Sequence, residues 1–313
     1  MNQNIIPKQT TIIVGFSGGS DSAYLLEKLF DIQSDYDLTI IAAHLDHEWR
    51  ANSSEDVAWC KNYCEQKKIK FITKKISELA IPEPKTGSIE ASARIYRRFF
   101  LESIAQQHPN SLIALGHHRD DQIETFFIRL ARGTTAAGLG CMKPQDGIYI
   151  RPLLEISKEE ILSFLEEQNI GFLTDPTNKD TTMLRNHIRA KLIPQLQTID
   201  SRFIKNIEKT IFHLQDSYDA FESVTEKMVN EISTENLIST EQFLAFSDSI
   251  KDEILSKLLI KQQCQITQSS RLFKEIIRFL DCGTQKKHLV HPSCEVTKIK
   301  DQFTISNPLL TEL

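Results

Sequence analysis

The sequence predicts an α/β fold, in which a doubly wound, mainly parallel sheet is followed by a second, smaller domain that is all-helical or mostly helical. Extended and helical patterns alternate along the first half of the 313-residue chain, which is typical of strands joined by crossover helices. The extended segments are almost continuously apolar, as strands covered on both faces should be. After residue 154 the pattern becomes mostly helical.

Four segments are expected to be strands, and helical patterns lie between them. The strands are 11–16, 38–45, 69–76 and 111–118. The helical segments carry an apolar stripe, or acidic residues at the start and basic residues at the end; they read DSAYLLEKLF, SSEDVAWCKNYCEQKK and IEASARIYRRFFLESIAQQ. Because ligands bind outside the carboxyl ends of parallel strands, we expect the site at that edge of the sheet.

The domain boundary is expected near residue 210, which separates a first domain, 1–210, from a helical domain, 211–313. The segment 81–88, IPEPKTGS, is expected to be a loop because of its proline and glycine. A basic helix is expected around 183–196. The basic segment 286–305, after the last helical pattern, could be extended.

Composition indicates a soluble globular protein, with 40% hydrophobic and 25% charged residues. No apolar run is long enough to span a membrane, and the N-terminus lacks the apolar core of a secretory signal, so a cytoplasmic location is expected. The six cysteines include no C-x-x-C pair and are expected to be free thiols. The net charge of −5 argues weakly against nucleic acid, yet 179–209 and 271–300 are basic and could be phosphate contacts or solvated helix faces.

A glycine- and serine-rich turn, FSGGSDS at residues 16–22, follows the first strand. Such a turn aims backbone N–H groups and a helix N-terminus at one point, which suits a phosphate. The turn lacks the lysine of the common P-loop and offers Asp21 instead. A carboxylate beside a polyphosphate is favourable chiefly when a divalent metal lies between them. We therefore expect ATP, Mg²⁺ and cleavage between the α and β phosphates; the alternative is a structural turn in which Asp21 caps the helix.

Further polar motifs narrow the choice of protein family. They are HLDHEWR at 44–50, EASARIYRR at 90–98, GHHRDDQIETFF from 116, RPLL at 151–154 and DPTNKDTTMLRNHIR at 175–189. With SGGSDS they resemble the tRNA(Ile)-lysidine synthetases, a group of N-type ATP pyrophosphatases with an adenine nucleotide alpha hydrolase-like fold. The resemblance covers about residues 11–196. Glu48 and Trp49 replace a Gly-Leu pair of the family pattern, which puts the local loop shape in doubt but not the chemistry.

The resemblance implies an ATP-dependent ligase that joins L-lysine to C2 of the wobble cytidine of a CAU-anticodon isoleucine tRNA. This modification changes the codon read from AUG to AUA. In the implied reaction the C2 oxygen of the cytosine attacks the ATP α-phosphate and releases pyrophosphate. The lysine ε-amine then attacks C2 and AMP leaves. The resemblance also implies that the helical domain contacts the tRNA, and it suggests a homodimer.

The resemblance implies roles for individual residues. The residues implied to hold ATP are Ser17, Gly18, Gly19, Ser20, Asp21, Ser22, His44 and Arg185, with Asp21 on Mg²⁺. Those implied to bind lysine or tRNA are Asp120, Asp121, Glu124, Arg94, Arg97 and Arg189. The implied catalytic residues are Asp21, Asp121, Glu124, Arg94 and His117, and His117 or a desolvated acid could be the base for the amine.

Other interpretations remain open at this stage. Arg94 could form a structural ion pair with Glu90, four residues earlier on the same helix. Asp120 could cap a helix that begins at Asp121. The protein could instead be a tRNA-thiolating ATP pyrophosphatase, which generally needs a reactive cysteine or a C-x-x-C pair, or an amidotransferase-type ligase, which would need a glutaminase region. A non-catalytic tRNA-binding protein is the third alternative.

Overall fold

The computed structural model describes most of the chain, in two compact units. The described residues are 1–49, 53–81, 89–174, 184–234, 237–266, 268–282 and 286–310. The units are Met1–Gln215 and Asp216–Leu313. Several expectations lie outside the described residues: the loop at 82–88, the DPTNKDTTM segment, Arg50, and the side chain of Glu90 with its ion pair.

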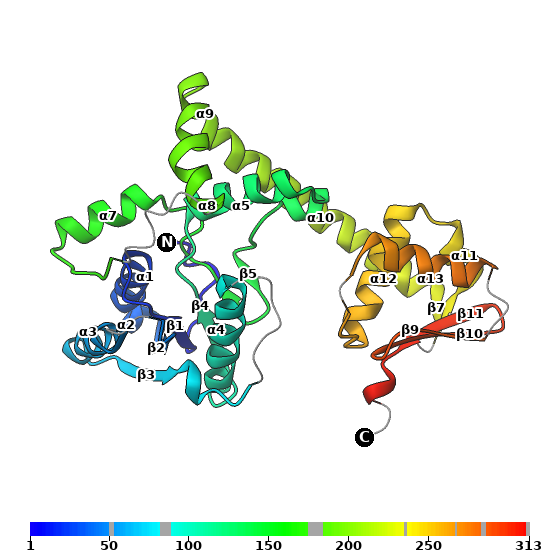
Figure 1. Cartoon of the computed structure of the whole chain (residues 1–313), viewed down its shortest axis with the longest axis horizontal. Helices are drawn as coiled ribbons and strands as arrows, with labels where there is room; N and C mark the ends of the chain where they lie inside the picture. The colour runs from blue at the N-terminus through cyan, green and yellow to red at the C-terminus, as the bar shows by residue number, and fades with distance from the viewer. Residues whose placement is uncertain are drawn as a thin grey trace. The chain divides into compact units, whose positions relative to one another are not determined.

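The first unit is built on a six-stranded sheet in the order β3-β2-β1-β4-β6-β5 (Figure 1). Its strands are β1 (Thr11–Gly15), β2 (Thr39–Asp46), β3 (Lys70–Lys75), β4 (Ser111–Ala114), β5 (Gln145–Asp146) and β6 (Tyr149–Ile150). All neighbouring pairs are parallel except β5 with β6. The predicted doubly wound, mainly parallel sheet is confirmed, and β4 ends at Ala114, earlier than expected.

Helices cover both faces of this sheet. The helices are α1 (Ser20–Asp31), α2 (Gln33–Tyr36), α3 (Ser53–Gln66), α4 (Ile89–Ala105), α5 (Arg119–Arg132), α6 (Ala136–Leu139), α7 (Lys158–Glu167), α8 (Leu184–His187), α9 (Ile193–Ile199) and α10 (Phe203–Ile232), with a 3-10 turn at Ile76–Glu78 and a π-helical turn at Ile188–Leu192. Apolar residues of α1, α3 and α7 form one core with β1 and β2. Residues of α4 form the second core on the opposite face. Because helices cover both faces of the sheet, the central strands are buried on both sides, and their sequences are unbroken apolar runs.

The order of the strands places two loops side by side. The chain leaves β1 toward β2 on one side and returns to β4 on the other, so the loops after β1 and β4 diverge from a common crevice. Gly116, after β4, lies so close to the first loop that a Cβ there would stand 3.1 Å from the backbone carbonyl of Asp21. Gly18, with φ +81°, has Leu173 and the Cys60 thiol where a Cβ would be. Both glycines are therefore required by close approach.

The second unit combines helices with a small antiparallel sheet. Its helices are α11 (Thr240–Ala245), α12 (Asp248–Lys261) and α13 (Ser270–Cys282), and the chain division falls within α10. The strands, in the order β7-β8-β11-β10-β9, are β7 (Ser233–Thr234), β8 (Leu237–Ser239), β9 (Lys287–His291), β10 (Cys294–Ile299) and β11 (Gln302–Ser306), followed by a 3-10 turn at Pro308–Leu310.

The all-helical alternative for this unit is therefore wrong, and the segment 286–305 is extended. Its strands bury alternate residues, Cys294 and Val296 on β10 and Phe303 and Ile305 on β11, against the helices. Lys298, at a position in phase with the buried residues, and the exposed Ile299 interrupt this alternation in the sequence. The assignment of tRNA binding to 211–313 stays a prediction. No helix among the described residues is long and apolar enough to cross a membrane.

Candidate active site

The turn after β1 is a tight structure held by its own hydroxyl groups. Ser22 Oγ donates to the carbonyl of Gly19 at 2.9 Å and lies 3.3 Å from Ser17 Oγ, which accepts from the Gly19 N–H at 3.4 Å. Helix α1 begins at Ser20, and its N-cap, Gly19, has no side-chain partner for the first N–H groups. The predicted turn thus leads into a helix N-terminus whose first N–H groups have no side-chain cap, an arrangement that suits an anion.

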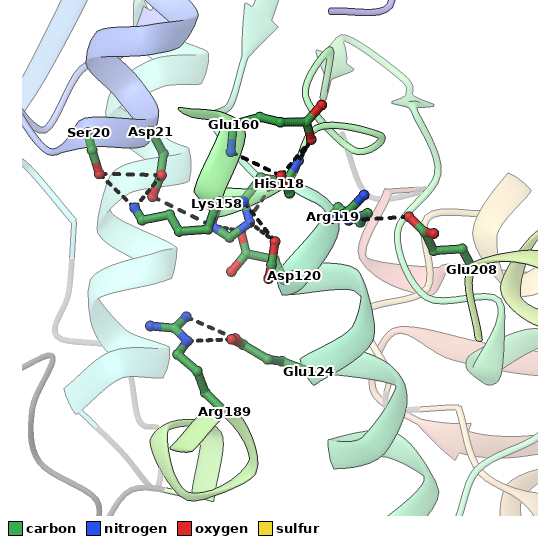
Figure 2. Close-up of polar contacts among 12 residues, drawn as sticks. Ser20, Asp21, His118, Arg119, Asp120, Glu124, Lys158, Glu160, Arg189 and Glu208 are labelled. Carbon is green, nitrogen blue, oxygen red and sulfur yellow. Dashed lines mark hydrogen bonds and ion pairs between the residues drawn. The ribbon is translucent and has the colours of Figure 1, made fainter. Parts of the chain in front are cut away.

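A lysine does reach this turn, but from a distant part of the chain. The Nζ of Lys158, the first residue of α7, lies 2.5 Å from Asp21 Oδ1 and 2.6 Å from Ser20 Oγ (Figure 2). About a third of each charged side chain remains exposed. Sequence reasoning missed Lys158; the one local signal is a cation in the first turn of a helix, where the dipole disfavours it.

The loop after β4 brings a histidine and two carboxylates to the same place. His118 Nε2 lies 3.7 Å from Asp21 Oδ2 and 3.5 Å from Asp121 Oδ2, and His118 Nδ1 lies 3.6 Å from Asp120 Oδ2. Burial alone would lower the pKa of the His118 ring, but the surrounding carboxylates outweigh burial and raise it. His118 was not among the expected site residues.

Asp120 and Asp121 have different local roles. Helix α5 begins at Arg119, and Asp121 closes its first turn by accepting the His118 N–H at 3.0 Å. The expectation that Asp120 caps a helix beginning at Asp121 is therefore wrong, because the helix starts two residues earlier. Asp120 accepts the backbone N–H of Lys158 at 2.9 Å. Burial opposes its ionisation, yet His118 and Lys158 hold the pKa of Asp120 at about 2.

One turn further along α5, Glu124 is completely buried against two arginines. Its Oε1 accepts from Arg189 Nε at 2.5 Å and its Oε2 from Arg189 Nη2 at 3.1 Å (Figure 2). Arg185 Nε lies 3.3 Å from Oε2. The Glu124 side chain is 0% exposed. Burial raises the pKa of the Glu124 carboxyl, although both guanidinium groups oppose the rise. Three expected site residues are thus brought together as one charge cluster.

An open cavity joins these two groups of residues. Its volume is about 470 Å³, and it is lined by His118, Asp120, Lys158, Glu159, Leu162, Ser163, Glu166 and Arg189. Cavities of this size hold small molecules. The lining carries both positive and negative groups, so it suits a ligand that bears both charges.

The other expected residues lie around this centre or apart from it. Burial and the charge of nearby arginines lower the pKa of His117 to about 4, and its buried Nδ1 has no hydrogen-bond partner among the described residues. Arg94 is exposed and is one of the charges acting on His117. Buried His44 contacts the carbonyl of Phe16 at 2.9 Å and supports the turn from behind. Arg97 instead contacts His47 at 3.5 Å.

The carboxylates present fit a partial magnesium site. Among the described residues, no three or more His, Cys, Asp or Glu side chains form a group able to hold a metal. Mg²⁺ commonly takes one or two carboxylates and completes its shell with substrate phosphates and water. Asp21, beside the turn and partly exposed, fits that pattern once Lys158 moves aside.

Comparison with known proteins decides the family. Residues 1–196 match the model of the PP-loop domain. The chain belongs to the PP-loop family. Membership in the PP-loop family implies the use of ATP.

Relatives and a solved structure agree with this assignment. The tRNA(Ile)-lysidine synthase of Bacillus subtilis (strain 168) is 33% identical over 89% of this chain and 61% of its own length. That of Francisella tularensis subsp. tularensis (strain WY96-3418) is 31% identical over 85% of this chain and 65% of its length. The chain thus spans about three fifths of the length of these curated relatives. The U34-tRNA thiolase NcsA from Methanococcus maripaludis shares the fold, with a TM-score of 0.57 and 18% identity over 68% of this chain and 74% of that one.

Proposed function

We propose that this PP-loop protein is a tRNA(Ile)-lysidine synthase, which uses ATP to join L-lysine to the wobble cytidine of a CAU-anticodon isoleucine tRNA. The observation that carries the proposal is the meeting, at one edge of the sheet, of the phosphate-binding turn with the Asp120, Asp121 and Glu124 cluster. Relatives of that name are similar along most of the chain. The proposal extends to the helical unit as a tRNA contact and to a homodimer.

In the first step the turn would bind the ATP phosphates. The N–H groups at the start of α1 would face the phosphate oxygens, and Lys158 would exchange its contact with Asp21 for one with a phosphate. Asp21 would then be free to hold Mg²⁺, which offsets negative charge on the α-phosphate and the leaving pyrophosphate. The 2.5 Å contact between Lys158 and Asp21 supports this exchange, because each group is held where its new partner would arrive.

In the second step the cavity beside Asp120 would hold L-lysine. The amino acid carries two ammonium groups and a carboxylate, and the cavity offers Asp120, Glu159 and Glu166 with Arg189 and Lys158. Asp120 stays ionised throughout the neutral range because its pKa is held at about 2. Glu124, fully engaged by two arginines, would orient Arg189 toward the carboxylate of the substrate rather than meet the amine itself.

The attacking ε-amine must lose a proton before it reaches C2 of the cytosine. We assign this role to His117 on its geometry, because its buried Nδ1 has no hydrogen-bond partner among the described residues. The pKa of about 4 keeps the ring neutral at pH 7 but also makes it a weak base, so the contribution of His117 to the rate should be modest. Arg94, which lies close enough to influence His117, would face the same ligand.

The test is to incubate the purified protein with ATP, Mg²⁺, L-lysine and a CAU-anticodon isoleucine tRNA transcript. We expect AMP release together with incorporation of lysine into the RNA, reduced at least a hundredfold in Asp21→Ala. ATP cleavage with tRNA but without lysine transfer would point to the thiolation alternative. No AMP from any tRNA would contradict the enzymatic proposal and leave an RNA-binding protein.

A further inference from the structure

An exposed tryptophan follows the strand next to the phosphate-binding turn. Trp49 is 58% exposed, and its indole is stacked on the imidazole of His47, with ring centroids 4.7 Å apart and planes at 29°. Single exposed apolar residues are common on protein surfaces. This one differs because its ring is supported from behind by a second aromatic ring, which fixes the orientation of its plane.

The loop that carries Trp49 is held in an uncommon conformation. Glu48 has φ 54°, in the left-handed region, where a residue with a side chain is disfavoured. Two hydrogen bonds keep it there: the Glu48 N–H donates to Asp46 Oδ1 at 2.9 Å, and Glu48 Oε2 accepts the Ser77 N–H at 3.0 Å. Such strain persists only where the surroundings maintain it, and it is concentrated at functional sites.

The electrostatic setting of the ring is suited to a polyanion. His47 is neutral at pH 7, because burial and the charge of Arg97 lower its pKa to about 4. Exposed Lys74 and Lys75 lie on β3 opposite the end of β2. The nearby carboxylates of Asp46 and Glu48 are each occupied by a backbone N–H. Arg97 thus contacts the histidine that supports the ring, and the two lysines lie on the neighbouring strand, while Asp46 and Glu48 keep their charge and hold the loop in place.

The ring also lies at the functional edge of the sheet. Strand β2 pairs with β1 in parallel, and the Phe16 N–H, at the start of the turn, donates to the carbonyl of Ala43 at 2.9 Å. His47–Trp49 follow the carboxyl end of the same strand, whose last residue is Asp46. A ligand that extends from the ATP turn along this edge therefore meets Trp49.

We propose that Trp49 is a stacking platform for an unpaired nucleotide of the RNA substrate, with Lys74, Lys75 and Arg97 facing its phosphates. Unpaired bases stack on exposed aromatic side chains in many RNA complexes, because every base offers a flat π-face. The inference rests on the proposed function for the identity of the RNA. It adds a contact in the catalytic unit for a base other than the one that reacts.

The first test compares Trp49→Leu with Trp49→Phe in the full-length protein. Binding of a labelled anticodon stem-loop RNA with a CAU anticodon is measured by fluorescence anisotropy. We expect the leucine variant to bind about tenfold more weakly, as for the loss of one stacked base, and the phenylalanine variant to bind nearly as well as wild type. Thermal unfolding should be unchanged in both, since the side chain is exposed.

The second test observes the ring directly. The chain has two tryptophans, so Trp59→Phe leaves Trp49 as the sole indole fluorophore. The stem-loop should quench its emission, and the same RNA with abasic loop positions should not. This readout needs no lysine transfer, so failure of the proposed activity would leave it intact.

Three outcomes would overturn the inference. Equal RNA affinity in wild type and Trp49→Leu would show that the ring contributes no stacking. A raised KM for ATP with unchanged RNA affinity would show that the ring stacks on the adenine of ATP instead. Quenching by abasic and intact RNA alike would assign the signal to the phosphates and would equally contradict base stacking.

Discussion

Two carboxylate–cation pairs in the site, Asp21 with Lys158 and Glu124 with Arg189, have similar distances and opposite surroundings. In both pairs the shortest nitrogen–oxygen distance is 2.5 Å. About a third of each side chain is exposed in the first pair, whereas Glu124 is 0% exposed and meets a second arginine. An exposed carboxylate can exchange its partner for another one or for water, whereas the buried Glu124 carboxylate has no solvent to replace its arginines, although Arg189 itself is 46% exposed.

This difference in exposure indicates that the loop after β1 and the first turns of α5 have different roles. In the loop after β1, Asp21 is partly exposed, so a ligand can replace Lys158 as its partner. Substitutions in this loop should therefore affect activity strongly and stability little. In the first turns of α5, the Glu124 carboxylate is buried in the folded core, so Glu124 should matter for both activity and stability. Variants at the two positions test this division directly.

The largest effect is expected from Glu124→Gln. The amide leaves Arg185 and Arg189 without a counter-charge, and removal of one partner of a buried pair costs about 3–5 kcal/mol; because these arginine side chains are 37% and 46% exposed, we expect a loss at the lower end of that range. The free energy of unfolding, measured with urea, should fall by that order. The matched control is Asp200→Asn, which removes an equally bidentate but exposed partner of Arg202 and should leave stability unchanged. Equal, small effects in both variants would contradict the comparison.

Asp21→Ala should lower activity strongly and leave stability almost unchanged. Loss of the group proposed to hold Mg²⁺ should lower the rate of ATP cleavage by about 10²–10³-fold, as for removal of one electrostatic contact to a developing charge. Unfolding should be almost unaffected, because the released Lys158 side chain can turn to water. The measurements are AMP release with tRNA present and urea unfolding. A strongly destabilised Asp21→Ala protein would show that this pair, too, belongs to the core.

The same contrast explains what the sequence could predict of the fold. Central strands such as Ile12–Val14 and Ile40–Ala43 are buried on both faces, so an apolar run is sufficient to recognise them. The turn at Ser17–Ser22 is local and carries its own signature. In the second unit, Val296 and Phe303 are buried between half-buried polar neighbours, and so short an alternation in a basic segment gave no firm strand prediction.

Site residues that lie close together in the sequence could be predicted from it. Site residues that only tertiary contacts bring together could not. Asp120, Asp121 and Glu124 are close in sequence and stood out as a cluster. Lys158 reaches Asp21 from 137 positions away, and nothing in SKEEILS predicts that contact. Of the two adjacent histidines, the sequence analysis named His117 as a site residue and left out His118, although the fold directs His118 toward Asp21.

Lys158→Met should have a smaller effect, confined to the ATP step. A hydrogen bond to a charged group contributes about 1.5–3 kcal/mol, so the KM for ATP should rise by about 10- to 100-fold. Lys158→Arg keeps the charge and should recover part of the loss, whereas the KM for tRNA should stay unchanged in both. If Lys158→Met instead bound ATP more tightly, the lysine would act as a competitor of ATP rather than as its ligand.

The smallest effect is expected from Asp120→Asn, and it should depend on pH. Burial disfavours the charged carboxylate, but His118 and the Lys158 N–H outweigh it and lower the pKa of Asp120 to about 2. A carboxyl whose pKa is lower in the folded state stabilises the protein above its unfolded pKa, near 4, and loses this contribution as the pH falls toward 2. Because the side chain is 40% exposed, solvent screening limits the contribution to about 1 kcal/mol at pH 7. The free energies of unfolding of wild type and Asp120→Asn, measured with urea, should therefore differ by that amount at pH 7 and converge below pH 4. A difference that stayed constant down to pH 2 would mean that the Asp120 charge contributes nothing to stability.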